Sequence, residues 1–386
     1  MVAAVRAGQS LRSVAREFQV SLPTVQRWVA RAGTARLDRV AWADRAPIPH
    51  TRHRTAPAVE EHVLALRRTL RDESPLGEYG AAAIRQAWRR QWGARPALRT
   101  IGRILQRRGA LDGRRRVRTP PPPVGWYLPA VAQGAAELDS FDTIEDLVIE
   151  GGIPVEVLTG VSLHGGLVAA WPEAAVTTDV VLAALEAHWR AWGRPAYAQF
   201  DNDTRFQGPH QFQDAIGRVT RLCLSLDIVP VFAPVQEHGF QAAIEAFNGR
   251  WQAKVWHRFH HEARTALQAR SARYVAAHRR RTAARQDGAP GRRPFPAAWQ
   301  FDPRDPVRGR LVFLRRTTAT GAAVLLGRTF AVDPHWVHRL VRCEVDLNAA
   351  MLRFYALRRR EPTSQPLLRE VPYTLPATRG SRVTSR

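Results

Sequence analysis

Apolar positions in the first third of the chain recur at the three- and four-residue spacing of amphipathic helices. This spacing predicts three helices near the amino terminus, with Ser10 and Ser21 as N-cap residues. The predicted ranges are Val2–Ala7, Leu11–Phe18 and Leu22–Ala32. Because only a short break separates the second helix from the third, the two helices can pack at an angle, as in a helix-turn-helix. An ordinary three-helix unit with a solvated basic face fits the same pattern.

A second helical block follows a linker that contains Pro and His. The apolar spacing predicts helices over Val59–Leu70, Ala81–Trp92 and Leu98–Arg108. Turn residues between these helices suggest another helix-turn-helix-like module. After it, a run of arginines and four prolines reads as an extended basic linker.

From Glu137 onward the pattern changes to short apolar runs and alternation, which is typical of strands. Three strands, a helix, a strand, a helix, a strand and a final helix are predicted in that order. Their ranges are 137–141, 153–163, 166–171, 178–192, 197–200, 211–225, 228–232 and 240–258. This order predicts a mixed sheet with helices on its faces, an α/β fold.

The carboxy-terminal third begins as a basic helix over 251–285 and continues through a linker rich in Pro and Gly. Five short alternating strands then predict a small β-barrel, and the tail from Thr363 is expected to be poorly ordered. The strand ranges are 311–314, 322–326, 328–332, 339–346 and 351–357.

These patterns divide the 386 residues into seven segments, a multidomain chain. The segments are a helix-turn-helix at 1–45, a second helical domain at 57–112, a basic linker at 113–130, an α/β core at 131–265, a basic helix and linker at 266–307, a small β-barrel at 308–360 and a tail at 361–386.

The distribution of charge adds to this division of the chain, because the net charge changes sign twice along the sequence. The chain carries a net charge of +24, and Lys254 is its only lysine, so the other basic residues are arginines. Residues 1–125 have a net charge of +16, residues 126–247 of −11 and residues 248–386 of +19. Two basic arms around an acidic centre predict a protein that binds a polyanion and uses carboxylates in its middle segment.

Other features exclude several classes of protein. Two cysteines cannot form a disulfide framework or a structural zinc site. The sequence contains no stretch of 18 apolar residues and no amino-terminal signal peptide, so we expect a cytoplasmic protein without a membrane partner. Walker and Gly-x-Ser-x-Gly motifs are absent, which leaves nucleotide hydrolases and serine hydrolases without support.

The basic arms supply candidate DNA contacts. In a helix-turn-helix the second helix enters the major groove, and arginines fork onto phosphates or guanines. The predicted DNA-binding residues are Thr24, Gln26, Arg27 and Arg31 in the first module, Arg99, Arg103 and Arg107 in the second, and Arg114, Arg115 and Arg116 in the linker. Further phosphate contacts are predicted at Arg315, Arg316, Arg342, Arg353 and Arg358 to Arg360.

Acids lie at the ends of the predicted central strands, where chemistry gathers in α/β sheets. Asp139 lies in the first strand, Asp201 ends the fourth, and Glu245 lies in the final helix of this segment. Carboxylates brought together without basic partners repel one another, so their natural companion is a hard cation such as Mg²⁺. Two such ions can hold the attacking and leaving oxygens of a phosphoryl transfer.

Three motifs in the centre resemble those of retroviral-type integrases and the related DDE transposases of bacterial insertion sequences. The family's Asp-Asn-Gly-x-x-Phe signature is similar to residues 201–206, Asp-Asn-Asp-Thr-Arg-Phe. Its Val-Glu-x-x-Asn helix is similar to residues 244–248, Ile-Glu-Ala-Phe-Asn, and its first-strand acid segment to residues 138–143. The similarity spans about residues 131–260 in the family's order.

The resemblance implies an RNase H-like core whose catalytic, metal-binding acids are Asp139, Asp201 and Glu245. It also implies Mg²⁺ or Mn²⁺ as the cofactor, with two ions expected, and Asn202 and Asn248 as supporting residues that orient carboxylates or contact DNA. Asp142 competes with Asp139, because residues three apart on a strand point to opposite faces and only one can reach the site.

Two departures from the family's pattern affect this assignment. Asp201 and Glu245 are separated by 43 residues, more than is typical of the family, and Glu237 lies at the typical interval. We favour Glu245 because it carries the local Glu-x-x-Asn context. The motif glycine is replaced by Asp203.

By this resemblance the chain is identified as a DNA transposase or integrase of a bacterial mobile element. Such an enzyme cuts element ends and joins them to target DNA by metal-dependent phosphoryl transfer, acting as a homo-oligomer on DNA in the nucleoid. The alternatives are an inactive, domesticated transposase that binds DNA as a regulator, and a nuclease that hydrolyses DNA without joining it.

Overall fold

The structure is a computed structural model that describes residues 1–43, 55–111, 125–208, 212–234, 237, 239–359 and 361–376. Contacts divide the chain into two compact units, Met1–Glu60 and Glu61–Arg386. We describe each unit by itself. Among the described residues, no helix has the length and apolar character needed to cross a membrane.

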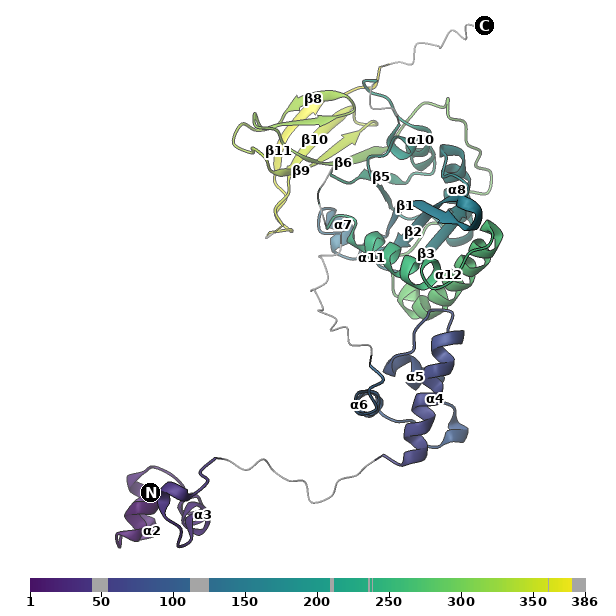
Figure 1. The fold of residues 1–386 in the computed structure, drawn as a ribbon. Helices are drawn as coiled ribbons and strands as arrows, with labels where there is room; N and C mark the ends of the chain where they lie inside the picture. Colours follow the sequence, from purple (N-terminus) through teal and green to yellow (C-terminus); the bar gives the residue numbers. More distant parts are fainter. Residues whose placement is uncertain are drawn as a thin grey trace. The chain divides into compact units, whose positions relative to one another are not determined.

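The amino-terminal unit contains the three predicted helices. They are α1 (Val2–Arg6), α2 (Leu11–Glu17) and α3 (Leu22–Ala32), followed by the 3-10 turn η1 (Leu37–Arg39), and are drawn in purple in Figure 1. The Ser10 hydroxyl accepts a hydrogen bond from the Ser13 N–H at 3.2 Å, which caps α2 as the sequence predicts. Val14 and Val25 are fully buried between the helices.

The second helical block has three helices where the sequence predicts them, but the second ends at Ala87, five residues before its predicted end at Trp92. It comprises α4 (Pro57–Glu73), α5 (Ala81–Ala87), the 3-10 turn η2 (Arg90–Trp92) and α6 (Leu98–Arg107). Helix α6 buries Ile101, Ile104 and Leu105 and packs on α5. Its opposite face carries Arg99 and Arg103, which are exposed.

A nine-stranded mixed sheet organises the rest of the chain. Its strand order is β11-β10-β9-β6-β5-β4-β1-β2-β3. Strands β1, β4, β5 and β6 run parallel to one another, and the remaining neighbours are antiparallel. The strands are β1 (Leu138–Ile149), β2 (Ile153–Ser162), β3 (Val168–Glu173), β4 (Tyr197–Phe200), β5 (Val229–Phe232), β6 (Arg310–Arg316), β9 (Leu340–Asp346), β10 (Met351–Ala356) and β11 (Leu367–Pro372). The fold is therefore mixed α/β with a large central sheet (Figure 1).

Strand β1 is longer than the sequence predicts, since it continues eight residues past Phe141 to Ile149. A bulge between Ile144 and Leu147 shifts the register against β2, and Asp146 adopts a left-handed φ of 58° there. A bulge interrupts the two-residue alternation by which a strand is recognised. The second half of β1 therefore carries no clear strand pattern in the sequence.

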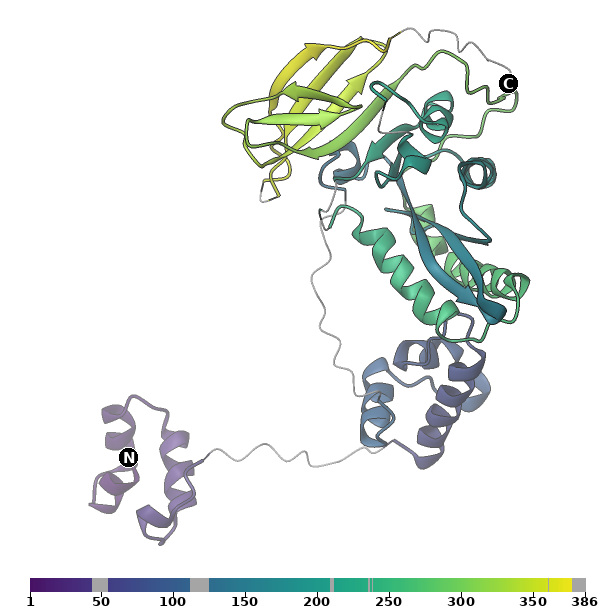
Figure 2. The ribbon, with the colours of Figure 1, turned by 45° about the horizontal axis from the view of Figure 1, so that its top comes forward.

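Helices cover both faces of the sheet. On one face α8 (Thr178–Trp192) and α10 (Arg218–Ser225) form a core with residues such as Phe141 and Leu158. On the other face α11 (Ala242–Trp251) and α12 (Arg264–Asp287) pack on residues such as Ile144 and Val157. The short helices α7 (Pro129–Ala132) and α9 (Thr204–Gln207), the 3-10 turn η3 (Glu150–Gly152) and the π-helical turn η4 (Gln252–Trp256) complete the fold. Figure 2 shows α11 and α12 beside the long β1–β2 hairpin.

The carboxy-terminal strands extend the central sheet, whereas the sequence predicts a separate small barrel. Strand β6 pairs in parallel with β5, so β6, β9, β10 and β11 continue the row of core strands. The two remaining strands, β7 (Ala322–Leu325) and β8 (Arg328–Ala331), form their own two-stranded sheet. Strand β11 lies inside the segment predicted to be a poorly ordered tail, which corrects that prediction.

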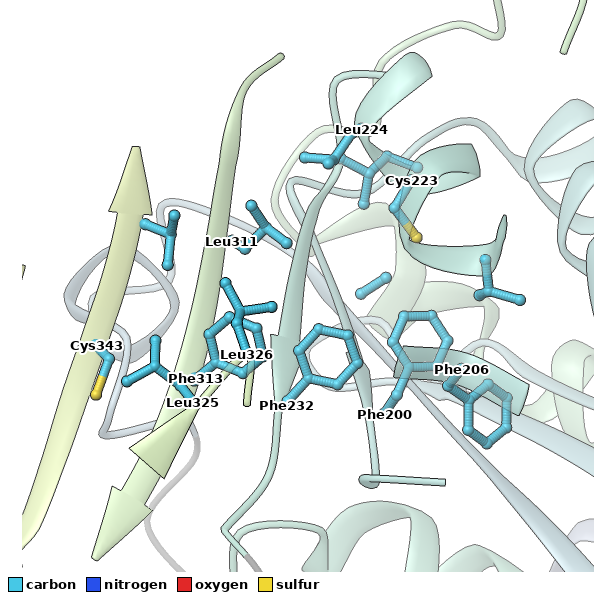
Figure 3. Packing of buried hydrophobic residues seen from close by; sticks show 14 of the residues in the cluster. Phe200, Phe206, Cys223, Leu224, Phe232, Leu311, Phe313, Leu325, Leu326 and Cys343 are labelled. Carbon is cyan, nitrogen blue, oxygen red and sulfur yellow. The ribbon is translucent and has the colours of Figure 1, made fainter. Parts of the chain in front are cut away.

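A row of phenylalanines joins the core to these carboxy-terminal strands (Figure 3). Ring centroids are 5.1 Å apart for Phe200 and Phe206, 6.3 Å for Phe200 and Phe232, and 5.0 Å for Phe232 and Phe313. All four side chains are fully buried. Because one hydrophobic core spans β4, β5 and β6, these strands behave as parts of one packed body.

Candidate active site

Strand register places Asp142 at the same level of the sheet as Asp201. Strands β1 and β4 are parallel, and Ser140 pairs with Gln199. Two residues further along both strands are Asp142, within β1, and Asp201, directly after β4. Side chains in register on neighbouring parallel strands share a face, so the two carboxylates lie on the same side of the sheet.

Helix α11 brings Glu245 to the same face. The helix is fixed by the buried side chains of Ile244, Phe247 and Trp251, while Glu245 is exposed. Asn248, one turn after Glu245, donates a hydrogen bond from Nδ2 to Asp142 Oδ2 at 2.8 Å. This bond ties the helix that carries Glu245 directly to the strand that carries Asp142.

The pKa of Asp142 is raised to about 6 by burial and by the charges of the two other acids. Burial is the main cause, and the negative charges of Asp201 and Glu245 raise the pKa further. Hydrogen bonds from the Thr143 N–H, at 2.9 Å, and from Asn248 oppose this rise. The pKa of Asp201 is also raised, again chiefly by burial. Asp142 and Asp201 are therefore partly buried carboxylates, and the exposed Glu245 is near enough for its charge to act on Asp142.

Asp139, the predicted first acid, lies on the opposite face of the sheet from Asp142. Asp139 pairs in register with Ala198 and is 1 % exposed. Arg292 donates to both of its oxygens, at 2.8 and 2.6 Å, and Trp189 Nε1 donates to Oδ2 at 3.1 Å. Although burial alone would raise the pKa of Asp139, Arg292 brings it below its ordinary value. Asp139 is thus a buried structural ion-pair partner on the α8 face.

His188 lies beside this ion pair without adding charge to it. Its Nε2 is 3.9 Å from Asp139 Oδ2. Burial lowers the pKa of His188 to about 4, so the ring is neutral at pH 7. The buried pair is therefore a single arginine–aspartate contact.

Thr159 supports the Asn248–Asp142 contact from the neighbouring strand. It is fully buried on β2, opposite Asp142 in the register. Its hydroxyl lies 2.7 Å from Asn248 Oδ1 and 3.1 Å from the Asp142 carbonyl oxygen. With Oδ1 accepting from Thr159, the Asn248 amide group presents its N–H to the Asp142 carboxylate. Sequence reasoning missed Thr159, because a threonine in a strand carries no signal of its own.

The chain after Asp201 forms a tight turn in which Asp203 replaces the family's glycine. Asp203 has a φ of −61°, so the position does not need a glycine. Its N–H donates to Asp201 Oδ1 at 3.0 Å, and its carboxylate caps α9 and accepts from Arg205. Arg205 also contacts Glu145 and Glu156. The turn thereby orients Asp201. It also holds Arg205 in ion pairs with Asp203, Glu145 and Glu156.

Asn202 ties the ends of two strands together, as its Nδ2 donates to the Ala233 carbonyl oxygen at 2.6 Å. The bond connects the residues that follow β4 and β5. Asn202 is therefore placed to support the position of Asp201.

Glu237, which lies at the family's typical interval from Asp201, is held by arginines. Arg316 and Arg359 both contact its carboxylate. Glu245, by contrast, contributes to the negative charge that raises the pKa of Asp142. Glu237 is thus held in ion pairs, whereas Glu245 is exposed on α11.

The three acids have the right chemistry for a hard divalent cation but are not drawn tightly together. Within the described parts of the chain, no group of three or more His, Cys, Asp or Glu side chains is close enough to form a ready-made metal site. The donors are carboxylate oxygens, which suit Mg²⁺ and Mn²⁺. The raised pKa of Asp142 indicates that a cation here would relieve repulsion.

In the amino-terminal unit, the predicted DNA-contacting residues differ in availability. Gln26 and Arg27 are exposed on α3. The Thr24 hydroxyl lies 2.8 Å from the Ser21 hydroxyl. Arg31 donates to the Ala43 carbonyl oxygen, and its guanidinium lies 5.0 Å from the Trp28 ring centroid. Arg31 is therefore partly occupied by contacts within the unit.

The other predicted DNA contacts fall into three groups. Arg99, Arg103 and Arg107 are exposed on α6. Arg114, Arg115 and Arg116 lie outside the described residues. Among the carboxy-terminal arginines, Arg342 is only 7 % exposed and contacts Glu344 and Gln365, so it is not available to a phosphate.

Comparison with known proteins gives solved structures only, since no family model and no curated protein matches the chain. The BIV integrase catalytic core domain matches with a TM-score of 0.28 and 15 % identity, over 36 % of this chain and 81 % of that one. The HTLV-2 integrase catalytic core domain in complex with magnesium matches in a dimeric form (TM-score 0.24, 14 % identity, 31 % and 70 %) and in a trimeric form (0.24, 15 %, 31 % and 69 %). At this level of identity and TM-score, the comparisons assign no family to the chain.

Proposed function

We propose that this protein is a DNA transposase or integrase, an enzyme that cleaves the ends of a mobile element and joins them to target DNA. The observation that carries the proposal is the convergence of Asp142, Asp201 and Glu245 on one face of the sheet. Asp142 takes the place that the sequence resemblance gave to Asp139. The motif order of the sequence and the basic arms on either side of the acidic segment agree with this function.

The three carboxylates would hold Mg²⁺ or Mn²⁺. When bound, such ions activate a water or a DNA 3′-hydroxyl and stabilise the charge that develops on the phosphate. Glu245 is exposed, whereas Asp142 is held by Asn248 and Thr143.

Residues of this chain have distinct roles in the proposal. Asp142 is a fixed ligand, because Asn248 and the Thr143 N–H hold its two oxygens in place. Asp201 is oriented by the Asp203 N–H. Asn202 and Asn248 are positioning residues. Arg27 on α3, with Arg99, Arg103 and Arg107 on α6, would contact the DNA backbone or bases.

Incubation of the purified chain with Mg²⁺ and DNA from both sides of its own gene tests the proposal. We expect nicking at defined positions and joined products with target DNA, and loss of both in Asp142→Asn, Asp201→Asn and Glu245→Gln. Glu186→Gln, which neutralises an exposed acid on α8 that pairs with Arg190, is the matched control and keeps activity.

Three results would contradict the proposal. Equal activity in Glu245→Gln and in the unchanged chain would exclude the metal site. Sequence-specific DNA binding without cleavage or joining under any metal would favour the regulator, and cleavage without joining would favour the nuclease.

A further inference from the structure

Glu237 has no role in the proposed chemistry, yet its carboxylate is firmly held. It lies between β5 and α11, eight positions before Glu245. Arg316 donates to its Oε1, through Nε at 2.6 Å and also through Nη2. Arg359 donates to the other oxygen, Oε2, at 3.3 Å. Each oxygen of the Glu237 carboxylate therefore accepts hydrogen bonds from a different arginine.

These arginines belong to a larger cationic groove on the carboxy-terminal strands. The groove is open, has a volume of about 610 Å³ and includes Arg316, Arg339, Arg358 and Arg359. Trp336 forms part of its wall, with the guanidinium carbons of Arg339 and Arg358 at 4.7 and 5.4 Å from the ring centroid. Arginines stacked on a ring keep their N–H groups directed outward for a planar acceptor.

Accessibility differs between the acid and the arginines around it. The side chain of Glu237 is 16 % exposed, whereas those of Arg316 and Arg359 are 48 % and 53 % exposed. A ligand from solvent can thus reach the arginines while Glu237 stays shielded. Four arginines face two acids in the groove, Glu237 and Glu361, so the groove remains positive with both acids in place.

We infer that this groove is a binding site for DNA backbone phosphate and that Glu237 occupies it in the absence of DNA. Two non-bridging phosphate oxygens offer the same forked acceptor as the carboxylate. The inference rests on the proposed function, because it takes DNA as the ligand. When DNA binds, the phosphate replaces Glu237 on Arg316 and Arg359.

DNA binding by the full chain tests this inference, with fluorescence anisotropy and a labelled duplex of arbitrary sequence as the probe. Glu237→Gln removes the internal competitor. We expect it to tighten binding about two- to five-fold, which corresponds to one exposed ion pair. The matched control is Glu186→Gln, which neutralises an acid paired with Arg190 at 2.8 Å on α8, outside the groove.

Arginine variants decide whether the gain arises at this site. The double variant Arg316→Ala/Arg359→Ala should weaken binding, lower the salt slope by about 0.9 for each phosphate that is no longer neutralised, and abolish the gain from Glu237→Gln. Thermal melts confirm that each variant is folded. Equal tightening in Glu186→Gln, or a gain that persists without the two arginines, would overturn the inference.

The two proposals fail separately. If the unchanged chain cleaves and joins DNA but Glu237→Gln binds no more tightly than the control, only the phosphate site is wrong. If Glu237→Gln tightens binding through the arginines but the chain neither cleaves nor joins DNA, only the enzymatic proposal is wrong.

Discussion

Neutralising Asp142 should raise the free energy of unfolding, whereas neutralising Asp139, three residues earlier on β1, should lower it. Asp142 has a pKa raised from 3.8 to about 6, chiefly by burial and by the charges of Asp201 and Glu245. A difference of about 2 pKa units corresponds to about 3 kcal/mol by which ionised Asp142 destabilises the folded chain. We expect Asp142→Asn to remove this cost and to lose about 1 kcal/mol of hydrogen bonding to Asn248 and Thr143. The net gain in the free energy of unfolding is about 2 kcal/mol at about pH 7.5.

The pH dependence of this effect has a defined direction. Because the pKa of Asp142 is higher in the folded state, the folded chain binds its proton more tightly, and stability falls as pH rises from about 4 to about 6. Asp142→Asn does not show this fall. In thermal melts without metal, the variant should therefore melt slightly below the unchanged chain near pH 4, where only the lost hydrogen bonding counts, and a few degrees above it once the pH exceeds about 6.

Asp139→Asn is the matched comparison. Arg292 lowers the pKa of Asp139 against the effect of burial, so this carboxylate stabilises the chain above about pH 4 and loses its effect as pH falls. Its neutralisation leaves Arg292 buried without a counter-charge and should cost about 3–5 kcal/mol at neutral pH. A fall in melting temperature for Asp142→Asn at about pH 7.5, or a difference that does not change between about pH 4 and pH 7.5, would refute the charge argument.

Three further expectations concern metal, DNA and packing. Mg²⁺ or Mn²⁺ should raise the melting temperature of the unchanged chain and do so much less in Glu245→Gln; an equal rise in both would argue against this metal site. Arg99→Ala/Arg103→Ala should weaken DNA binding and lower the salt slope by about 1.8, and an unchanged slope in anisotropy titrations would exclude contact by α6. Gly160→Ala places a Cβ 2.7 Å from the Phe141 ring, so we expect about 1–3 kcal/mol of destabilisation in urea unfolding; unchanged stability would contradict the close packing between β2 and that ring.

Local patterns in the sequence were enough to predict most elements. Helix α8 and strand β4 have the predicted bounds, and the three amino-terminal helices differ from prediction by at most one residue. Each of these elements is defined by its own capping or apolar spacing, which depends on neighbours in the chain. The prediction failed where the spacing was interrupted, as in the second half of β1, where a bulge breaks the alternation.

The candidate site depended more strongly on tertiary contacts. Sequence patterns singled out Asp201, Glu245 and Asn248 and indicated that only one of Asp139 and Asp142 can face the site. The sequence patterns could not decide between Asp139 and Asp142. Alternation along the strand places the two side chains on opposite faces, but it does not say on which face the helix that carries Glu245 packs. That choice depends on Arg292, 153 residues away, which pairs with Asp139, and on Asn248, 106 residues away, which binds Asp142.

The order of helices and strands, the alternation of basic and acidic segments, and the short set of candidate acids all follow from the amino-acid sequence alone. The face that each acid occupies, the arginines that hold Glu237 and the extension of the central sheet by the carboxy-terminal strands emerge only in the folded chain. The difference arises from the range of the interactions. Helix and strand patterns act over a few residues, whereas burial, ion pairing and sheet register join residues that are distant in the chain.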